Sequence, residues 1–284
     1  MNTDHTTLIS ANALRTLLGS GTPVVSIDAG FDLANVDAGE RAWREGHLPG
    51  ALYLHLDRDL SGAKTGANGR HPLPARDVFA ATLGRCGITP QTQVIAFDRQ
   101  GGVYASRLWW MLRWMGHSAA AVLDGGVAAW VEAGGTLVTE TSSPTAAPPY
   151  PKRPAIGATI SADALAARLG RARLIDARAA ERFRGDVEPL DTTAGHIPGA
   201  LNRFFKDNLD AASGRFKTAG QLRAEFAPLL GAAGAADAVH QCGSGVTACH
   251  NLLAMEYAGL PGSALYAGSW SEWCADPARP VARG

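Results

Sequence analysis

An internal duplication limits the possible folds of this chain more than any other feature of its sequence. Three pairs of similar segments occur in the same order: residues 9–19 with 160–170, residues 46–51 with 195–200, and residues 125–130 with 268–273. The second pair reads Gly-His-Leu-Pro-Gly-Ala and Gly-His-Ile-Pro-Gly-Ala. Because the pairs keep their order over most of the chain, the sequence predicts two domains of the same fold.

A proline-rich stretch separates the two halves. Residues 140–156 carry five prolines, which lack amide donors and favour extended backbone. We therefore expect a first domain over residues 1–139, a linker over residues 140–156 and a second domain over residues 157–284.

Each half begins with the pattern of a short capped helix followed by a strand. Ser10 and Ser161 are the expected helix caps, and the strands are expected to end at Asp28 and Asp176. Later apolar runs, at residues 94–97 and 238–240, precede glycine turns and helical patterns. This alternation predicts an α/β fold in which each domain has a mainly parallel sheet with helices on both faces.

Composition excludes several kinds of partner. Lys+Arg and Asp+Glu balance at 26 each, so no net charge favours binding to nucleic acid or to a membrane surface. The first residues lack the basic start and apolar core of a signal peptide, and no apolar run is long enough to span a bilayer. The four cysteines form no Cys-x-x-Cys pair, which favours free thiols over a disulfide framework or a metal site. We therefore expect a cytoplasmic protein without a bound metal.

One cysteine lies where a thiolate would be stabilised. Residues 240–248 (His-Gln-Cys-Gly-Ser-Gly-Val-Thr-Ala) place Cys242 on a glycine turn between a predicted strand and a helix expected over residues 247–258. The backbone amides that could surround the sulfur belong to Gly243, Ser244, Gly245, Val246 and Thr247. The pattern predicts a nucleophilic Cys242. In the first half, Asp98 occupies the corresponding position and offers no thiol, so we expect that domain to be non-catalytic.

These segments together resemble a known family. The chain is similar over nearly its full length to tandem rhodanese-domain sulfurtransferases, and residues 242–248 (Cys-Gly-Ser-Gly-Val-Thr-Ala) most resemble the 3-mercaptopyruvate sulfurtransferase branch. The resemblance implies two rhodanese-like domains, a persulfide on Cys242 and no metal or organic cofactor. It also implies a small-molecule sulfur donor and an acceptor that is cyanide or a thiol, such as a thioredoxin-like protein or a low-molecular-weight thiol.

The resemblance also implies roles for residues outside the cysteine loop. Arg182 matches the family arginine that binds the substrate, while Ser244, His71 and Asp57 match positions implicated in the mercaptopyruvate branch, where they would polarise a carbonyl or manage a proton. His71 lies in a glycine-rich loop over residues 61–74 that is a candidate for reaching the other domain's site. The alternative is that Asp57 and His71 only stabilise that loop.

One position departs from the family pattern. A second substrate arginine follows a Glu-Pro pair in the animal mercaptopyruvate enzymes, whereas Leu190 stands there in this chain. Another cation could substitute for it. Arg70, Arg99 and Arg107 are the candidates, and the sequence does not choose among them.

Three alternatives compete with the interpretation that this chain is a 3-mercaptopyruvate sulfurtransferase. Thiosulfate is the alternative donor, although the neutral Gly243 and Ser244 lack the basic residues that follow the cysteine in thiosulfate enzymes of the family. A cysteine-dependent phosphatase needs an arginine six residues after the cysteine, where this chain has Ala248. A non-catalytic persulfide carrier is the third alternative, and retention of the complete cysteine motif argues against it.

Overall fold

The computed structural model describes residues 4–284 and divides into two compact units. The first unit contains the described residues up to Ser61 together with Pro74–Ile156 and Ala211–Phe216, and the second contains Gly62–Leu73, Gly157–Asp210 and Lys217–Gly284. The two repeats therefore form separate units, but the loop 62–73 groups with the second one.

The first unit is built on a five-stranded sheet in which every strand pair is parallel. Its strand order is β1-β5-β4-β2-β3. The strands are β1 (Leu8–Ile9), β2 (Val24–Asp28), β3 (Leu52–Tyr53), β4 (Gln93–Phe97) and β5 (Ala120–Leu123), and the helices are α1 (Ala11–Leu18), α2 (Ala38–Glu45), α3 (Arg76–Arg85), α4 (Ala105–Trp114) and α5 (Gly126–Glu132).

The second unit repeats this topology, with strand order β6-β10-β9-β7-β8 and only parallel pairs. The strands are β6 (Ala158–Thr159), β7 (Arg173–Asp176), β8 (Leu201–Asn202), β9 (Ala238–Gln241) and β10 (Ala264–Leu265). The helices are α6 (Ala162–Ala166), α7 (Ala180–Arg184), α8 (Ala219–Leu230), α9 (Thr247–Tyr257) and α10 (Ser269–Trp273), with 3₁₀ turns at Phe205–Asn208, Gly231–Ala233 and Ala235–Asp237. The duplicated parallel α/β fold expected from the sequence is thereby confirmed.

The local signals read from the sequence act as expected. The side chain of Ser10 accepts a hydrogen bond from the Ala13 amide, and that of Ser161 accepts one from the Ala164 amide, so each caps its helix. Strands β2 and β7 end at Asp28 and Asp176. A parallel strand buried on both faces needs a continuous apolar run, and β4 is buried along its whole length.

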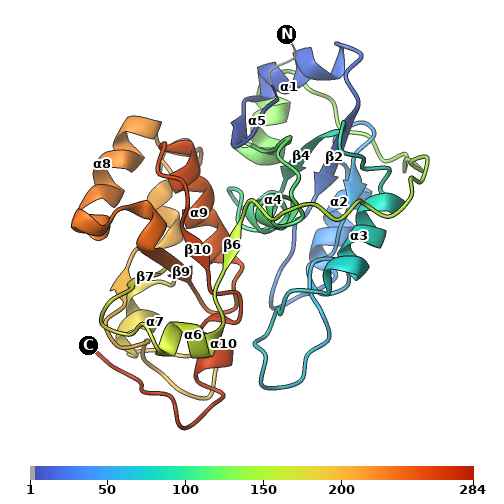
Figure 1. Cartoon of the computed structure of the whole chain (residues 1–284). Coiled ribbons are helices and arrows are strands. Elements are labelled where there is room, and N and C mark those ends of the chain that lie inside the picture. The colour runs from blue at the N-terminus through green and yellow to red at the C-terminus, as the bar shows by residue number, and fades with distance from the viewer. Residues whose placement is uncertain (1–3) are drawn as a thin grey trace. The chain divides into compact units, whose positions relative to one another are not determined.

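Helices cover both faces of each sheet (Figure 1). In the first unit, α1 and α5 pack against the β4 face that carries Ile95 and Phe97. In the second unit, Leu165 of α6 and the tryptophans of α10 pack on the β9 face that carries Val239, while α8 and α9 cover the opposite face.

Helix α9, which begins directly after the cysteine loop, is more deeply buried than the sequence indicated. The sequence alone places Ala248, Cys249, Leu252, Leu253 and Met255 on or near one apolar face, but every residue from Ala248 to Met255 is buried. The polar members are satisfied inside, because the amide of Asn208 contacts the side chains of His250 and Asn251. The N-terminus of this helix is therefore held rigidly beneath the cysteine loop.

The proline-rich segment 140–156 makes hydrogen bonds to the first unit. The amides of Ala147 and Tyr150 donate to the carbonyls of Gly84 and Ala80 on α3, and the Tyr150 hydroxyl contacts Nδ1 of His117 at 2.9 Å. The segment is therefore packed on the first unit despite its prolines. Among residues 4–284, no helix is both long enough and apolar enough to cross a membrane.

Candidate active site

The cysteine loop lies at the carboxyl end of β9, the middle strand of the second sheet. Cys242 follows the last residue of β9, and its side chain is 2 % exposed. The Gly245 amide donates to the Cys242 Sγ at 3.2 Å. Gly245 has a φ of +76°, and a Cβ there would lie 2.2 Å from the Ala267 carbonyl oxygen, so only glycine fits this turn. The backbone thus presents an N–H group to the sulfur, as a thiolate requires.

The first unit shows what kind of group this loop is shaped to hold. The Asp98 carboxylate is 1 % exposed and accepts hydrogen bonds from four backbone amides, those of Gln100, Gly102, Tyr104 and Ala105, at 2.8–3.0 Å. In the repeat alignment, Gly102 corresponds to Gly245, whose amide contacts the cysteine sulfur. The loop after the middle strand therefore binds an anion in the first unit, where Asp98 supplies it, and the matching turn of the second unit directs the Gly245 amide at the Cys242 sulfur.

Ser269, which the sequence did not single out, holds the backbone of the cysteine loop through a hydrogen bond. Ser269, the first residue of α10, accepts a hydrogen bond from the Cys242 amide at 3.1 Å and donates to the Tyr266 carbonyl at 2.9 Å. Its φ is +54°, the only positive value at a non-glycine position among residues 4–284. The repeat offers the one sequence signal for this residue, because Gly126 stands at the matching position with a φ of +56°. A serine held in a left-handed conformation stores strain, which indicates that its hydroxyl has a task there.

Helix α10 adds two more hydrogen bonds to the same loop. The amides of Trp270 and Ser271 donate to the carbonyls of Cys242 and Gly243, each at 3.0 Å. The segment Gly-Ser-Trp-Ser-Glu-Trp therefore positions the cysteine backbone as well as packing the core, where Trp270 and Trp273 are fully buried.

The structure brings His71 and Ser244 together. The Nδ1 of His71 lies 2.8 Å from the Ser244 Oγ, and both side chains are buried, with 4 % and 7 % exposed. Ser244 is two residues from Cys242, so this pair belongs to the cysteine loop. Asp57 belongs to the first unit, where its amide donates to Nδ1 of His55 at 3.1 Å.

Two guanidinium groups approach the loop at Gly243. A Cβ placed on Gly243 would lie 2.8 Å from Nη2 of Arg70 and 3.4 Å from Nη1 of Arg182, so the absence of a side chain lets both cations reach the backbone. Arg182 forms ion pairs with Glu188 at 2.6 Å and with Asp191 at 3.4 Å. Arg70 also pairs with Asp191. Asp191 therefore bridges the two arginines.

A buried arginine supports this cluster from the core. Arg178 is 3 % exposed, pairs with Asp176 at 2.7 Å and with Glu188 at 3.4 Å, and lies over the ring of Trp270. Burial opposes its charge, but Asp176 and Glu188 outweigh this and raise the pKa of Arg178. Glu188 thus links a permanently charged core arginine to Arg182, which fixes the orientation of the latter.

The other thiols lack these features. Burial raises the pKa of Cys86 to about 11, and Cys249 is fully buried, with its Sγ 3.3 Å from the Gly245 carbonyl oxygen. The pKa of Cys274 is also raised, by burial and by the negative charge of Asp191. Burial thus disfavours the thiolate of Cys86 and of Cys274, and none of the three cysteines lies on a glycine turn after a middle strand.

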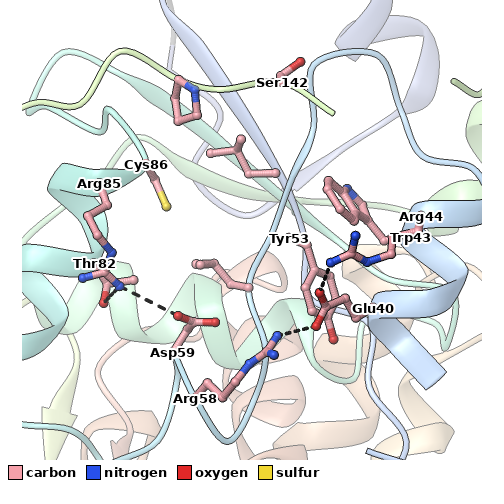
Figure 2. Close-up of a pocket in the computed structure, with 13 residues that line it drawn as sticks. Glu40, Trp43, Arg44, Tyr53, Arg58, Asp59, Thr82, Arg85, Cys86 and Ser142 are labelled. Atoms are coloured by element: carbon pink, nitrogen blue, oxygen red, sulfur yellow. Dashed lines mark hydrogen bonds and ion pairs between the residues drawn. The ribbon is translucent and has the colours of Figure 1, made fainter. Parts of the chain in front are cut away.

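A hollow in the first unit contains Cys86. It has a volume of about 390 Å³, and Figure 2 shows the Cys86 sulfur directed into it. Its charged groups pair with one another: Glu40 with Arg44 and Arg58, and Asp59 with Arg85. The raised pKa of Cys86 disfavours a nucleophilic thiolate, and the charged side chains are paired with one another, so we do not assign a reaction to this hollow.

The histidines of the two Gly-His-x-Pro-Gly turns have matching structural contacts. Nδ1 of His47 lies 2.7 Å from the Trp43 carbonyl oxygen, and Nδ1 of His196 lies 2.8 Å from the Phe183 carbonyl oxygen. Each imidazole also stacks on the aromatic ring of that same partner. Among residues 4–284, no group of three or more His, Cys, Asp and Glu side chains is arranged to hold a metal ion.

Comparisons with known proteins agree with this architecture. A family model described as "Rhodanese-like domain" matches residues 10–133 and 161–276. The "Probable 3-mercaptopyruvate sulfurtransferase" of Pseudomonas aeruginosa is 44% identical over 281 residues, covering 98% of each chain. The "Putative thiosulfate sulfurtransferase SseB" of Mycobacterium tuberculosis is 39% identical, covering 98% of this chain and 97% of the relative. The crystal structure of SseA from Escherichia coli, described under 3-mercaptopyruvate sulfotransferases, superposes with a TM-score of 0.77 at 29% identity, covering 94% of this chain and 99% of that one.

Proposed function

The chain belongs to the rhodanese family, and from this premise we propose that it is a sulfurtransferase that moves a sulfane sulfur from 3-mercaptopyruvate, through a persulfide on Cys242, to a thiol or cyanide. The observation that carries the proposal is the glycine turn around Cys242, in which the Gly245 amide donates a hydrogen bond to the Cys242 sulfur. The arginines beside Gly243 supply the charge that an anionic donor needs.

Asp98 explains how this turn would hold the persulfide. A carboxylate oxygen lies one bond beyond Cγ, as the outer sulfur of a persulfide lies one bond beyond Sγ. The amides of Tyr104 and Ala105 bind one of these oxygens, and their counterparts are the amides of Thr247 and Ala248. Those two amides open α9, where the first N–H groups lack acceptors within the helix. They are thus suited to bind the negatively charged outer sulfur.

The first half-reaction forms the persulfide. The Cys242 thiolate attacks the sulfur of 3-mercaptopyruvate, an S–S bond forms and the C–S bond breaks. The electron pair of the broken bond passes to carbon as the enolate of pyruvate, which takes up a proton and leaves. Negative charge develops on the donor's carbonyl oxygen in this step. The hydrogen-bonded Ser244 and His71 are the groups we assign to stabilise that oxygen and supply the proton.

The second half-reaction restores the cysteine. An acceptor thiolate attacks the outer sulfur and forms its own persulfide, and Cys242 leaves as a thiolate. With cyanide the product is thiocyanate. Neither half-reaction requires a metal or an organic cofactor. A low-molecular-weight thiol or a thioredoxin-like protein is the acceptor we propose, in the cytoplasm, where the four cysteines of this chain, none of them in a disulfide, would remain reduced.

Thiosulfate is the competing donor. Sulfite would then be the leaving group. Thiosulfate is a dianion, and Arg70 and Arg182 would offer it positive charge as well. The loop, however, places the neutral Gly243 and Ser244 directly after the cysteine, and the Ser244–His71 pair has a carbonyl to act on only in 3-mercaptopyruvate. The geometry therefore favours 3-mercaptopyruvate.

Mass spectrometry of the intact protein tests the persulfide. Incubation with 3-mercaptopyruvate should add the mass of one sulfur atom at Cys242, and a dithiol should remove it. Cys242→Ser should stay unmodified, while the control Cys274→Ser should behave as the wild type. A wild-type chain that remains unmodified with both donors would refute the enzymatic proposal. A kcat/KM for thiosulfate more than about tenfold above that for 3-mercaptopyruvate, or about 1.4 kcal/mol in the barrier, would refute the donor preference.

A further inference from the structure

The hollow that contains Cys86 lies at one edge of the first sheet. Strand β3 ends the strand order there and pairs with β2, and Leu52 and Tyr53 of β3 line the hollow together with residues of α2 and α3. All of its lining residues belong to the first unit, whereas Cys242 belongs to the second. A volume of about 390 Å³ is typical of sites that bind small molecules.

Much of the lining of this hollow is apolar. Trp43, Leu54 and Cys86 are buried, Leu52 is partly exposed, and Pro144 is exposed. The apolar surface that remains open is in contact with water, and the apolar body of a ligand would release that water. The lining therefore favours a ligand with an apolar part over a fully polar one.

The proline-rich segment 140–156 supplies one wall of the hollow, through Ser142 and Pro144. The segment runs close to the end of α3, because a Cβ placed on Gly87 would lie 2.8 Å from the Thr145 carbonyl oxygen. Prolines restrict the backbone of the segment further. The wall is therefore preorganised before any ligand binds, which lowers the entropic cost of binding.

The charged groups of the hollow leave a surplus of one positive charge. Its described lining contains three arginines and two carboxylates, namely Arg44, Arg58, Arg85, Glu40 and Asp59. The arginine side chains are 57–65 % exposed and the carboxylates 22 %, so an entering anion meets the guanidinium groups first. Hydrogen bonds from Arg44 and Arg58 lower the pKa of Glu40, which therefore stays ionised and orients both arginines.

Arg85 is the cation with the weakest carboxylate partner in this cluster. Glu40 pairs with Arg44 at 2.6 Å and with Arg58 at 2.5 Å, whereas Arg85 lies 3.8 Å from Asp59. The Nη2 of Arg85 also donates to the Thr82 hydroxyl at 3.0 Å, which holds the guanidinium at the hollow. A single cation of this kind suits a carboxylate monoanion.

We propose that this hollow is a binding site for a small monocarboxylate with an apolar body. The carboxylate would bind Arg85, and the apolar body would lie against Leu52, Leu54 and Cys86. The site is separate from the proposed sulfur transfer, because it involves neither Cys242 nor the arginines beside Gly243. It gives the first unit, which lacks the nucleophile, a ligand of its own.

Protection of the Cys86 thiol tests the proposal at the site itself. Figure 2 shows the sulfur directed into the hollow, so a bound ligand should shield it from iodoacetamide at alkaline pH. The probes are octanoate and 1-octanol, which share the apolar chain and differ in charge. Octanoate at about ten times its Kd should slow alkylation of Cys86 about tenfold, because the reaction follows the unbound fraction. Octanol should protect less, and Cys274 serves as the reference thiol in the same sample.

Substitution of Arg85 tests the charge. Arg85→Met should weaken octanoate about two- to fivefold, as expected for an exposed ion pair, and leave octanol unchanged. Arg85→Lys keeps the charge and should lose less. Arg184→Met is the matched control, because it removes an exposed arginine of the second unit whose partner is Asp186. Alkylation rates are compared with and without each probe, because burial raises the pKa of Cys86 and Arg85 partly offsets this.

The wild-type measurement alone can overturn the proposal. It fails if octanoate leaves Cys86 unprotected, if octanol protects equally well, or if Cys274 is slowed to the same extent. Stronger protection by octyl phosphate would assign the hollow to dianions instead, and equal effects of Arg85→Met and Arg184→Met would remove Arg85 from the site. Persulfide formation on Cys242 is measured separately, so none of these outcomes bears on the proposed sulfur transfer.

Discussion

The strained serine beneath the cysteine loop permits a prediction in which stability and activity respond differently. Ser269 has a φ of +54°, is fully buried, and its hydroxyl binds the Cys242 amide. Ser269→Ala keeps a Cβ in the left-handed region, which costs about 1–2 kcal/mol, and leaves a buried amide without a partner, at about 1–3 kcal/mol. Ser269→Gly loses the same hydrogen bond but relieves the strain.

The expected order of stability of the second unit is therefore wild type, then Ser269→Gly, then Ser269→Ala. The Ala variant should be about 2 kcal/mol less stable than the wild type, and the Gly variant should recover about 1 kcal/mol of that loss. Sulfur transfer should fall to the same extent in both variants, because both leave the Cys242 backbone without its partner.

Hydrogen exchange measured on peptides from residues 238–257 across a urea series reports on the second unit alone, which matters because the two units need not unfold together. An Ala variant as stable as the Gly variant would refute the strain argument. Equal sulfur-transfer rates in the wild type and both variants would refute the positioning of Cys242 by this hydroxyl.

Four further predictions follow from buried groups. Asp98→Asn replaces one acceptor oxygen with a donor facing backbone amides and should destabilise the first unit by about 3 kcal/mol in urea unfolding, with Cys242 still forming a persulfide; an unchanged midpoint would contradict the anion-binding turn. Since the pKa of Cys86 is about 11, its alkylation at pH 8 should trail that of Cys242 in peptide mapping, and equal labelling would contradict the assignment of the nucleophile. Burial lowers the pKa of His240 to about 3, so between that value and the ordinary 6.5 the unfolded chain binds more protons than the folded chain. The contribution of His240 to the free energy of unfolding is therefore complete above pH 6.5 and falls by about 2 kcal/mol at pH 5. His240→Leu should not show this loss, and an equal loss in that variant would contradict the role of His240. Gly243→Ala places a Cβ 2.8 Å from a guanidinium nitrogen and should raise KM for 3-mercaptopyruvate without unfolding the chain, and an unchanged KM would place the donor elsewhere.

The fold was predictable because its signals are local and appear twice. Serine caps, apolar strand runs and glycine stops depend on neighbouring residues, and the duplication allowed each to be checked against its counterpart. The burial of α9 on all sides was not predictable, because it depends on what packs around the helix. Asn208 accommodates the polar Asn251 there, and no pattern along the helix announces that partner.

The candidate site was predictable only where residue type and chain position suffice. Cys242 lies on a turn that its own sequence defines. The placement of Arg70 depends instead on a loop that leaves the first repeat in sequence and groups with the second unit, so three arginines remained equal candidates before the structure. Asp191, which bridges Arg70 and Arg182, was missed because its importance lies entirely in those partners.

Two differences between the repeats convert one turn into a different kind of site. In the first unit, Asp98 saturates the turn with its own charge, and Gly126 passes beneath it without strain. In the second unit, Cys242 supplies a shorter side chain, and in the proposed mechanism the transferred sulfur takes the place of the outer carboxylate oxygen. The cysteine then needs its backbone fixed by another means, and Ser269 provides this at the cost of a left-handed conformation. The turn is therefore occupied by its own side chain in one unit and left open in the other, and in the proposed mechanism this open turn is where sulfur binds and leaves.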